Sequence, residues 1–419
     1  MTDPSNSKHT SVCDQLKLIS APVFISVMLF GMATWISITG VWVEMPLLVN
    51  ALPESWNLPS YLVIIIQCAN LGPATYAIWD KIRQKTQQAR DSLIIILIAT
   101  LSMLLLSLFW DHTVVIASVN RSVALLTLVS FASLASCTSS VVFLPYMARF
   151  PPVYISAYYF GQGLCGLLPG LLGLAQVVGQ EPQCRNETNI NDTHTINITD
   201  VTPANTVYYS SPSFSVTAFF VLITVLLCFS LAAFCRLSFV HKCQRDGTDR
   251  QLVNVVEVSA ATEAKNNDNG AVHSDIVDPL TAGSATVLQR RRFASLLVTI
   301  GIISALWNGI LPATQTYTCL PYGNIVYRLS VCLSSVVSPL ATLTNMLAPT
   351  SSLPLIVGLG ATASVLSALH LLLAAQSPHP ILQGTVIGQV IVVSRQLCHA
   401  HYCEIFVSSD ILVTRTNTS

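Results

Sequence analysis

The sequence predicts an all-α fold: a polytopic membrane helix bundle with nine complete transmembrane helices, a partial tenth, and the two-half architecture of a transporter. Of 419 residues, 52% are hydrophobic and only 10% are charged, against roughly 25% charged residues in an average soluble domain. Nine apolar segments approach the roughly 20 residues that a helix needs to cross the hydrocarbon layer. They are 22–42, 61–79, 93–110, 123–146, 153–178, 214–235, 293–311, 325–348 and 353–375.

The loops between these segments predict the orientation in the membrane. Lysine and arginine gather in the loops after the second and the sixth helix, which is typical of cytoplasmic loops. The loop after the fifth helix holds three N-glycosylation sequons, at Asn186, Asn191 and Asn197, so we expect it to lie outside and to be glycosylated. Both signals place the N-terminus in the cytoplasm. The 20 basic and 20 acidic residues balance, which leaves no basic excess for nucleic acid.

The composition divides the chain into five segments. Residues 1–21 form a polar cytoplasmic N-terminus, and 22–235 form the first, six-helix half. Residues 236–292 mix Asn, Asp, Thr, Ala and Gly without periodicity, which predicts a disordered cytoplasmic linker. An incomplete second half, 293–393, and a tail, 394–419, complete the chain.

The first helix of each half is predicted to be interrupted. In residues 35–46 and again in 307–317, a polar residue and a glycine are followed by a proline. Transporters built from two related halves often bind their substrate where helices are broken at matching positions. We therefore expect a central site at the two interruptions.

The fifth helix has two different faces. Tyr154, Tyr158 and Gln162 share one side, which would line a cavity, while glycines on the opposite side would let a neighbouring helix approach closely. The alternative is that the tyrosines and the glutamine satisfy one another inside the bundle. On the second helix Gln67 and Asn70 share a face, with ligand contact and structural hydrogen bonding as the two alternatives.

Glu44 and two cysteines are the other polar or reactive groups that stand out. Glu44 lies near the exterior end of the first helix, and a carboxylate there is costly unless it reaches water, a cation or a proton. We expect a structural or gating role, with proton coupling as an alternative. Cys184 and Cys319 both fall outside the membrane, where they could form a disulfide. The Cys/His-rich segment 398–403 follows none of the usual zinc spacings, so no metal site is predicted.

Several ordered blocks of the sequence resemble the animal riboflavin transporter family. They are Gly40-Val-Trp-Val-Glu-Met-Pro-Leu-Leu-Val, Leu52-Pro-Glu-Ser-Trp-Asn-Leu-Pro-Ser-Tyr, Gln67-Cys-Ala-Asn-Leu-Gly-Pro, Phe160-Gly-Gln-Gly-Leu-Cys-Gly-Leu-Leu-Pro and Asn308-Gly-Ile-Leu-Pro-Ala-Thr-Gln-Thr-Tyr-Thr-Cys-Leu-Pro-Tyr-Gly. The resemblance covers residues 21–393. It implies a plasma-membrane carrier, built of eleven helices, that brings riboflavin into cells without sodium. Thr39 departs from the family pattern, which has Asn before the glycine.

Riboflavin is an uncharged ring system with a polyol chain, so it calls for aromatic stacking and amide hydrogen bonds. Each stacking contact would contribute about 1–3 kcal/mol, by analogy with nucleobases on aromatic side chains. The predicted substrate-binding residues are Trp42, Gln67, Asn70, Tyr154, Tyr158, Gln162, Trp307, Asn308 and Gln315. Uptake would proceed by alternating access between the two halves. The expected partners are riboflavin and membrane lipid, with no cofactor; the oligomeric state stays open.

The C-terminal end of the sequence predicts fewer spanning helices than the eleven that the resemblance implies. The apolar run 385–393 stops after about ten residues, and no later stretch is long enough to span. We expect the chain to leave the family pattern at Ser394, which makes a truncated, non-transporting isoform or gene model, retained inside the cell, the main alternative. A cell-surface receptor for an external ligand is a further alternative, although seven-helix receptors have the N-terminus outside. No catalytic motif is present, so an enzyme is not predicted.

Overall fold

The computed structural model describes residues 20–83, 87–116, 118–177, 182–184, 207–209, 213–262, 305–347 and 353–416. Helices dominate these residues, and two short antiparallel hairpins accompany them. Five helices or helical stretches in the described part are long and apolar enough to cross a membrane, and a bent pair makes a sixth. The predicted multi-pass helical architecture is therefore confirmed, while the count of nine complete helices is not.

The first half contains the following elements. They are α2 (Ala21–Met32), α3 (Ile36–Ala51), η1 (Ser55–Asn57), α4 (Leu58–Ala69), α5 (Leu71–Arg83), α6 (Gln88–Phe109), β1 (Val114–Ile116), β2 (Val119–Arg121), α7 (Val123–Met147), α8 (Pro152–Val177), β3 (Pro182–Cys184), β4 (Val207–Tyr209) and α9 (Val216–Thr262). β1 pairs with β2 and β3 with β4. α8 is long enough to span but is not among the apolar spans of the described residues, because its three tyrosines and two glutamines lower its hydropathy.

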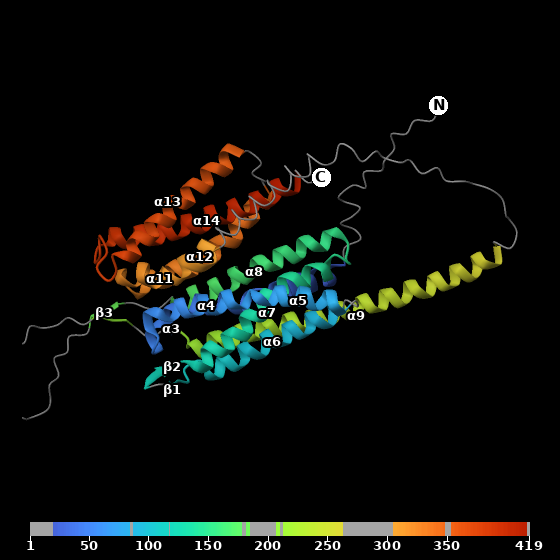
Figure 1. Cartoon of the computed structure of the whole chain (residues 1–419), viewed down its shortest axis with the longest axis horizontal. Helices are drawn as coiled ribbons and strands as arrows, with labels where there is room; N and C mark the ends of the chain where they lie inside the picture. The colour runs from blue at the N-terminus through green and yellow to red at the C-terminus, as the bar shows by residue number, and fades with distance from the viewer. Residues whose placement is uncertain are drawn as a thin grey trace, which may run out of the picture.

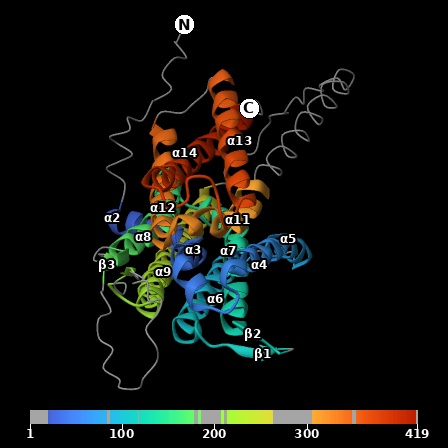
Figure 2. The same cartoon turned by 90° about the vertical axis from the view of Figure 1, so that its left-hand side faces the viewer.

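The second half begins, within the described residues, in the predicted seventh helix. Its elements are the π-helix η3 (Leu306–Ile310), α11 (Leu311–Cys319), the 3-10 turn η4 (Leu320–Tyr322), α12 (Asn324–Leu347), α13 (Leu353–Ala375) and α14 (Val386–Thr416). Figure 1 shows α11 to α14 as a layer along one side of the first half, and Figure 2 shows the same layering after a quarter turn. The interface is formed by α3, α4 and α8 on one side and by α11 and α12 on the other.

The interruption in the first helix lies earlier than its sequence predicts. α2 and α3 meet at an angle of 53° at residues 33–35, and Gly40 and Pro46 both lie inside α3 rather than at a break. The Thr34 hydroxyl donates to the Gly31 carbonyl at 2.8 Å, which offers the chain an alternative to the helical hydrogen-bond pattern at the bend. In the second half, the π-helix η3 does fall within the predicted segment 307–317.

Two helices continue past the boundaries that the composition predicts. α9 runs to Thr262, so residues 236–262 of the predicted disordered linker are helical. α14 runs from Val386 to Thr416, through the predicted end of the partial tenth helix at 393. Neither continuation contains a proline, so nothing in the backbone chemistry stops the helix. The composition predicts where the apolar residues end, but a helix can continue past that point.

The core of the first half lies where α2, α7 and α9 meet. Phe30 of α2 contacts Phe143 of α7 and Phe234 of α9, with ring centroids 4.5 and 5.0 Å apart, and Tyr146 closes the cluster at 5.8 Å from Phe30. These rings are among the largest fully buried side chains of the described residues. These rings pack α2 into the interior of the first half. The helices of the first half that contact the second half are therefore α3, α4 and α8.

Candidate functional site

The glycine face of α8 forms the contact with α12, and the predicted close approach of a neighbouring helix is confirmed. A Cβ added at Gly166 would lie 2.7 Å from the backbone oxygen of Ser335, and one at Gly170 would lie 3.0 Å from that of Cys332. A Cβ at Gly173 would lie 2.6 Å from the Cys332 sulfur. Because only a residue without a Cβ fits there, the two halves of the protein meet backbone to backbone along α8.

The opposite face of α8, which carries Tyr154, Tyr158 and Gln162, packs in part against α2. Tyr158 is fully buried against Phe30 of α2, with ring centroids 5.9 Å apart, and Tyr154 is buried beside the start of α2, where its hydroxyl accepts from the Ser20 N–H. Gln162 Nε2 donates to the Tyr158 hydroxyl at 3.4 Å. These contacts favour the alternative in which polar groups of this face are satisfied inside the bundle.

An amide cluster joins the two halves at η3. Gln67 Nε2 donates to the Asn308 carbonyl at 3.0 Å, and Asn70 Nδ2 donates to Gln67 Oε1 at 2.9 Å. Pro312 explains the first bond: it has no N–H to give the carbonyl four residues before it, so the amide of Gln67 supplies the missing donor. The side chains of Gln67, Asn70 and Asn308 are all exposed. This is the one group of predicted site residues that the structure brings together across the two halves, among the residues it describes.

The line of contact between α4 and α11 continues from that cluster toward η1. Ser60 Oγ donates to the Ala313 carbonyl at 3.2 Å, and the Tyr317 hydroxyl donates to Asn57 Oδ1 at 2.6 Å. The Tyr317 ring also meets Trp56 edge to face, with centroids 5.7 Å apart. Polar contacts therefore hold the two halves together along α4, from Gln67 to the loop after α3.

The other predicted site residues lie apart from one another. Trp42 is half-buried on α3, roughly 200° around the helix from Gly40, whose Cβ would meet Ile223 of α9 at 3.2 Å. Trp42 therefore points away from α9. Gln315 is buried on α11 in the second half. Trp307 lies on η3, and its side chain falls outside the described residues.

Glu44 belongs to a buried polar network. Gln176 Nε2 donates to Glu44 Oε1 at 3.0 Å, and Arg328 Nη2 donates to Gln176 Oε1 at 3.0 Å. Glu44 and Gln176 are each 1% exposed and Arg328 is 4% exposed. The amide thus connects a carboxyl group and a guanidinium that come from different halves.

Gln176 and Arg328 were missed by the sequence analysis. Gln176 is close to the predicted end of the fifth helix and reads as a loop-facing residue. Arg328 could have been identified from the sequence, because a charged residue inside a predicted span is costly in the membrane and normally pairs with another group. The acidic residue Glu44, near the end of another span, was the obvious candidate for that partner.

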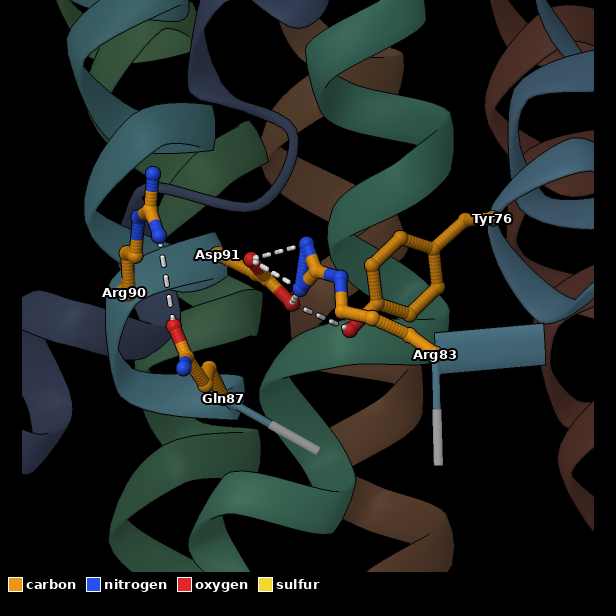
Figure 3. Close-up of polar contacts among 5 residues, drawn as sticks. All are labelled: Tyr76, Arg83, Gln87, Arg90 and Asp91. Atoms are coloured by element: carbon orange, nitrogen blue, oxygen red, sulfur yellow. Dashed lines mark hydrogen bonds and ion pairs between the residues drawn. The ribbon is translucent and has the colours of Figure 1, made fainter. Parts of the chain in front are cut away.

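A polar cluster near the turn between α5 and α6 stabilises the other end of the first half. Figure 3 shows Arg83 and Tyr76 of α5 pointing toward Asp91 of α6. Arg83 Nη1 lies 3.2 Å from both carboxylate oxygens of Asp91, and the Tyr76 hydroxyl donates to Asp91 at 2.9 Å. Arg90 donates to Gln87 beside it, at 3.4 Å. These contacts join neighbouring helices of one half, so they are separate from the interface between halves.

Of the two cysteines that could form a disulfide, the structure describes the side chain of Cys319 only. Cys319 is a free, fully buried thiol at the end of α11, so it is closed off from a partner in the loop after α8. The helix decides this, because it turns position 319 inward. The Cys184 side chain and the sequon residues Asn186, Asn191 and Asn197 lie outside the described residues.

Comparison with known proteins agrees with the resemblance that the sequence carries. A family model described as solute carrier family 52, riboflavin transporter, matches residues 19–411, past the predicted departure at Ser394. The Danio rerio protein named solute carrier family 52, riboflavin transporter, member 3-A is 38% identical over 387 residues, covering 87% of this chain and 82% of its own length. The Homo sapiens member 3 is 33% identical over 394 residues, covering 88% and 84%.

Solved structures give a weaker match. The nucleoside transporter NupG aligns over 94% of this chain and 82% of its own, at 11% identity and a TM-score of 0.47. The xylose transporter XylE from E. coli aligns over 95% and 87%, also at 11% identity, with a TM-score of 0.46. These scores are too low to establish a shared fold.

Proposed function

The chain belongs to solute carrier family 52, the riboflavin transporters, and on that premise we propose that riboflavin passes through a site between its two halves. Its function is to transport riboflavin across a membrane, and the family is not one of enzymes. The observation that carries the proposed site is the amide cluster at η3, where Gln67 and Asn70 of the first half meet Asn308 of the second.

The exposure of the three amides supports a water-filled path at this place. An amide facing hydrocarbon is costly, so exposed amides deep in a membrane protein are expected to face water or a ligand. Riboflavin carries a ring edge with alternating donors and acceptors, together with ribityl hydroxyls, and amides complement both kinds of group. The Gln67 side chain is engaged at both its nitrogen and its oxygen, by the Asn308 carbonyl and by Asn70, so Asn70 and Asn308 are the better candidates for direct hydrogen bonds to the substrate.

Trp42 is the remaining candidate for stacking on the ring system. It is half-buried, it belongs to a helix that contacts α12, and it points away from the first-half helix α9. Tyr154 and Tyr158 are less suitable, because both are buried against α2. Trp307 and Gln315 stay candidates on chemical grounds, as neighbours of Asn308 in the chain and on α11.

Alternating access is the mechanism that the interrupted helices support. The bend between α2 and α3 and the π-helix η3 occur in the first described helix of each half. π-Helical turns recur at functional sites, and broken helices at matching positions typically surround the substrate of two-half transporters. Rocking of one half on the other would expose the amide cluster first to one side of the membrane and then to the other.

Uptake of labelled riboflavin by cells that express the chain tests the function and the site together. Asn308→Ala is expected to lower uptake about tenfold, the equivalent of one hydrogen bond of about 1.4 kcal/mol, with surface expression unchanged. Gln389→Ala is the matched control, because it removes a side-chain amide of the second half that lies on α14, where it donates to the Tyr322 carbonyl at 3.2 Å, away from the proposed site. Equal uptake by the wild type and Asn308→Ala would remove Asn308 from the site, and absence of uptake by the wild type would refute transport by this chain.

We also propose that the protein lies in the plasma membrane with its N-terminus in the cytoplasm. The basic loop after α5 and the sequons after α8 support this orientation, because three predicted spanning helices separate them in the sequence and an odd number of spans puts two loops on opposite sides of a membrane. Replacing all three sequon asparagines with glutamine should increase mobility on a denaturing gel to that of the glycosidase-treated wild type. An epitope at the N-terminus should become accessible to antibody only after the cells are permeabilised.

A further inference from the structure

The Glu44–Gln176–Arg328 network is the one buried link between opposite charges of the two halves that the described residues contain. α3 and α8 of the first half supply Glu44 and Gln176, and α12 of the second half supplies Arg328. The Gln176 amide also donates to the Phe214 carbonyl just before α9, at 3.0 Å, which holds it in position. The network is therefore anchored on the first half and depends on the second for its cation.

The three residues lie at one end of the bundle, the end that carries the sequon loop. Gln176 is in the last turn of α8, immediately before that loop, and Arg328 is in the second turn of α12. At the same end, Asn50 Nδ2 of α3 donates to Asn324 Oδ1 at the start of α12, at 3.2 Å. These two asparagines are exposed, whereas the network is buried. The contact thus has a buried charged centre and a polar rim.

Burial makes the network sensitive to separation of the halves. A buried charge is tolerated when its partner and the connecting hydrogen bonds are present, and removal of one partner leaves the other uncompensated. In the observed arrangement Arg328 and Glu44 satisfy opposite ends of the same amide. If α12 moves away from α3 and α8, both charges lose their partners unless water enters between the helices.

We propose that this network is the latch that holds the outer end of the transport path closed. It forms when α12 meets α3 and α8, and it opens, with water reaching Glu44 and Arg328, when the path opens to the outside. Gln176 is the positioning residue, because it transmits the contact between two side chains that do not bond directly. The inference rests on the proposed alternating access and adds to it the residues that control one of the two states.

A cross-linking experiment tests the latch without riboflavin. Asn50→Cys and Asn324→Cys are introduced together, and a short bifunctional thiol reagent measures in membranes how often the outer ends are in contact. Each single cysteine variant reports background reaction of the native cysteines. In this background, Arg328→Gln is expected to lower the cross-linked fraction about fivefold or more. Adding Glu44→Gln to Arg328→Gln should restore part of it, since the uncompensated carboxylate is then removed.

Arg83→Gln is the matched control, because it removes an arginine from an ion pair inside the first half, far along the chain from α12. It should leave the cross-linked fraction unchanged. If Arg328→Gln does not give monodisperse protein, the test is made with Gln176→Leu instead. This variant removes the amide that connects Glu44 to Arg328 and keeps both charged residues. Unchanged cross-linking in the variant that folds would overturn the latch. Since the assay contains no riboflavin, a failure of riboflavin uptake and a failure of the latch are recorded separately.

Discussion

Gly166→Ala is expected to push the two halves of the protein apart. The new Cβ would lie 2.7 Å from the backbone oxygen of Ser335, which is 0.7 Å short of the 3.4 Å at which ordinary van der Waals contact begins. The obstacle is backbone, so no side chain can rotate out of the way and α12 itself has to move. Overpacking of this kind costs about 1–3 kcal/mol.

Gly163→Ala separates that cost from the effect of alanine on the helix. Its Cβ would lie 3.5 Å from the Cβ of Pro339, an ordinary contact with the same helix α12. In a helix interior, alanine is favoured over glycine by about 0.8–1.0 kcal/mol, and this gain is common to both variants. The free energy of unfolding of Gly166→Ala should therefore lie about 1–3 kcal/mol below that of Gly163→Ala.

The assay is denaturant unfolding of purified protein in detergent, with the wild type and both variants in one series. Gly163→Ala should unfold at or slightly above the denaturant concentration of the wild type, and Gly166→Ala below that of Gly163→Ala. Equal stabilisation of the two variants would refute the reasoning, because it would mean that α8 and α12 are not in backbone contact at Ser335.

Two further predictions use the same unfolding series. Gln67→Ala removes the donor to the Asn308 carbonyl and should cost about 0.5–1.5 kcal/mol, the net value of one hydrogen bond, because both residues are exposed; adding Pro312→Ala supplies a backbone N–H and should recover most of that loss, and no recovery would show that the carbonyl is satisfied in another way. Asp91→Asn should cost no more than about 1 kcal/mol, because its partner Arg83 is 31% exposed, and a loss several times larger would show that the pair is shielded from water.

Much of the architecture could be predicted without the structure, because it depends on local properties of the chain. Apolar segments of spanning length indicate membrane helices whatever their neighbours are. The glycines on one side of the fifth helix predicted close packing, since absence of a Cβ has that effect against any partner. The order of the matching sequence blocks along the chain was sufficient to identify the family. Helix ends were predicted poorly at 235 and 393, because apolar character and helical backbone end for different reasons.

The candidate site depended more strongly on packing. The sequence marks Tyr154, Tyr158 and Gln162 as one face but does not say which helix covers it, and α2 covers it. The sequence indicates that the Glu44 carboxylate is costly to place in a membrane, but it does not show which residue is its partner.

By itself, then, the sequence determined the class of protein, the family and the set of polar groups that are energetically costly to place in a membrane. Only the tertiary structure decided which of those groups meet. Glu44 and Arg328 are distant in the chain and are joined by Gln176 because α3, α8 and α12 converge, and such convergence follows from side-chain shapes packed in three dimensions rather than from any local pattern.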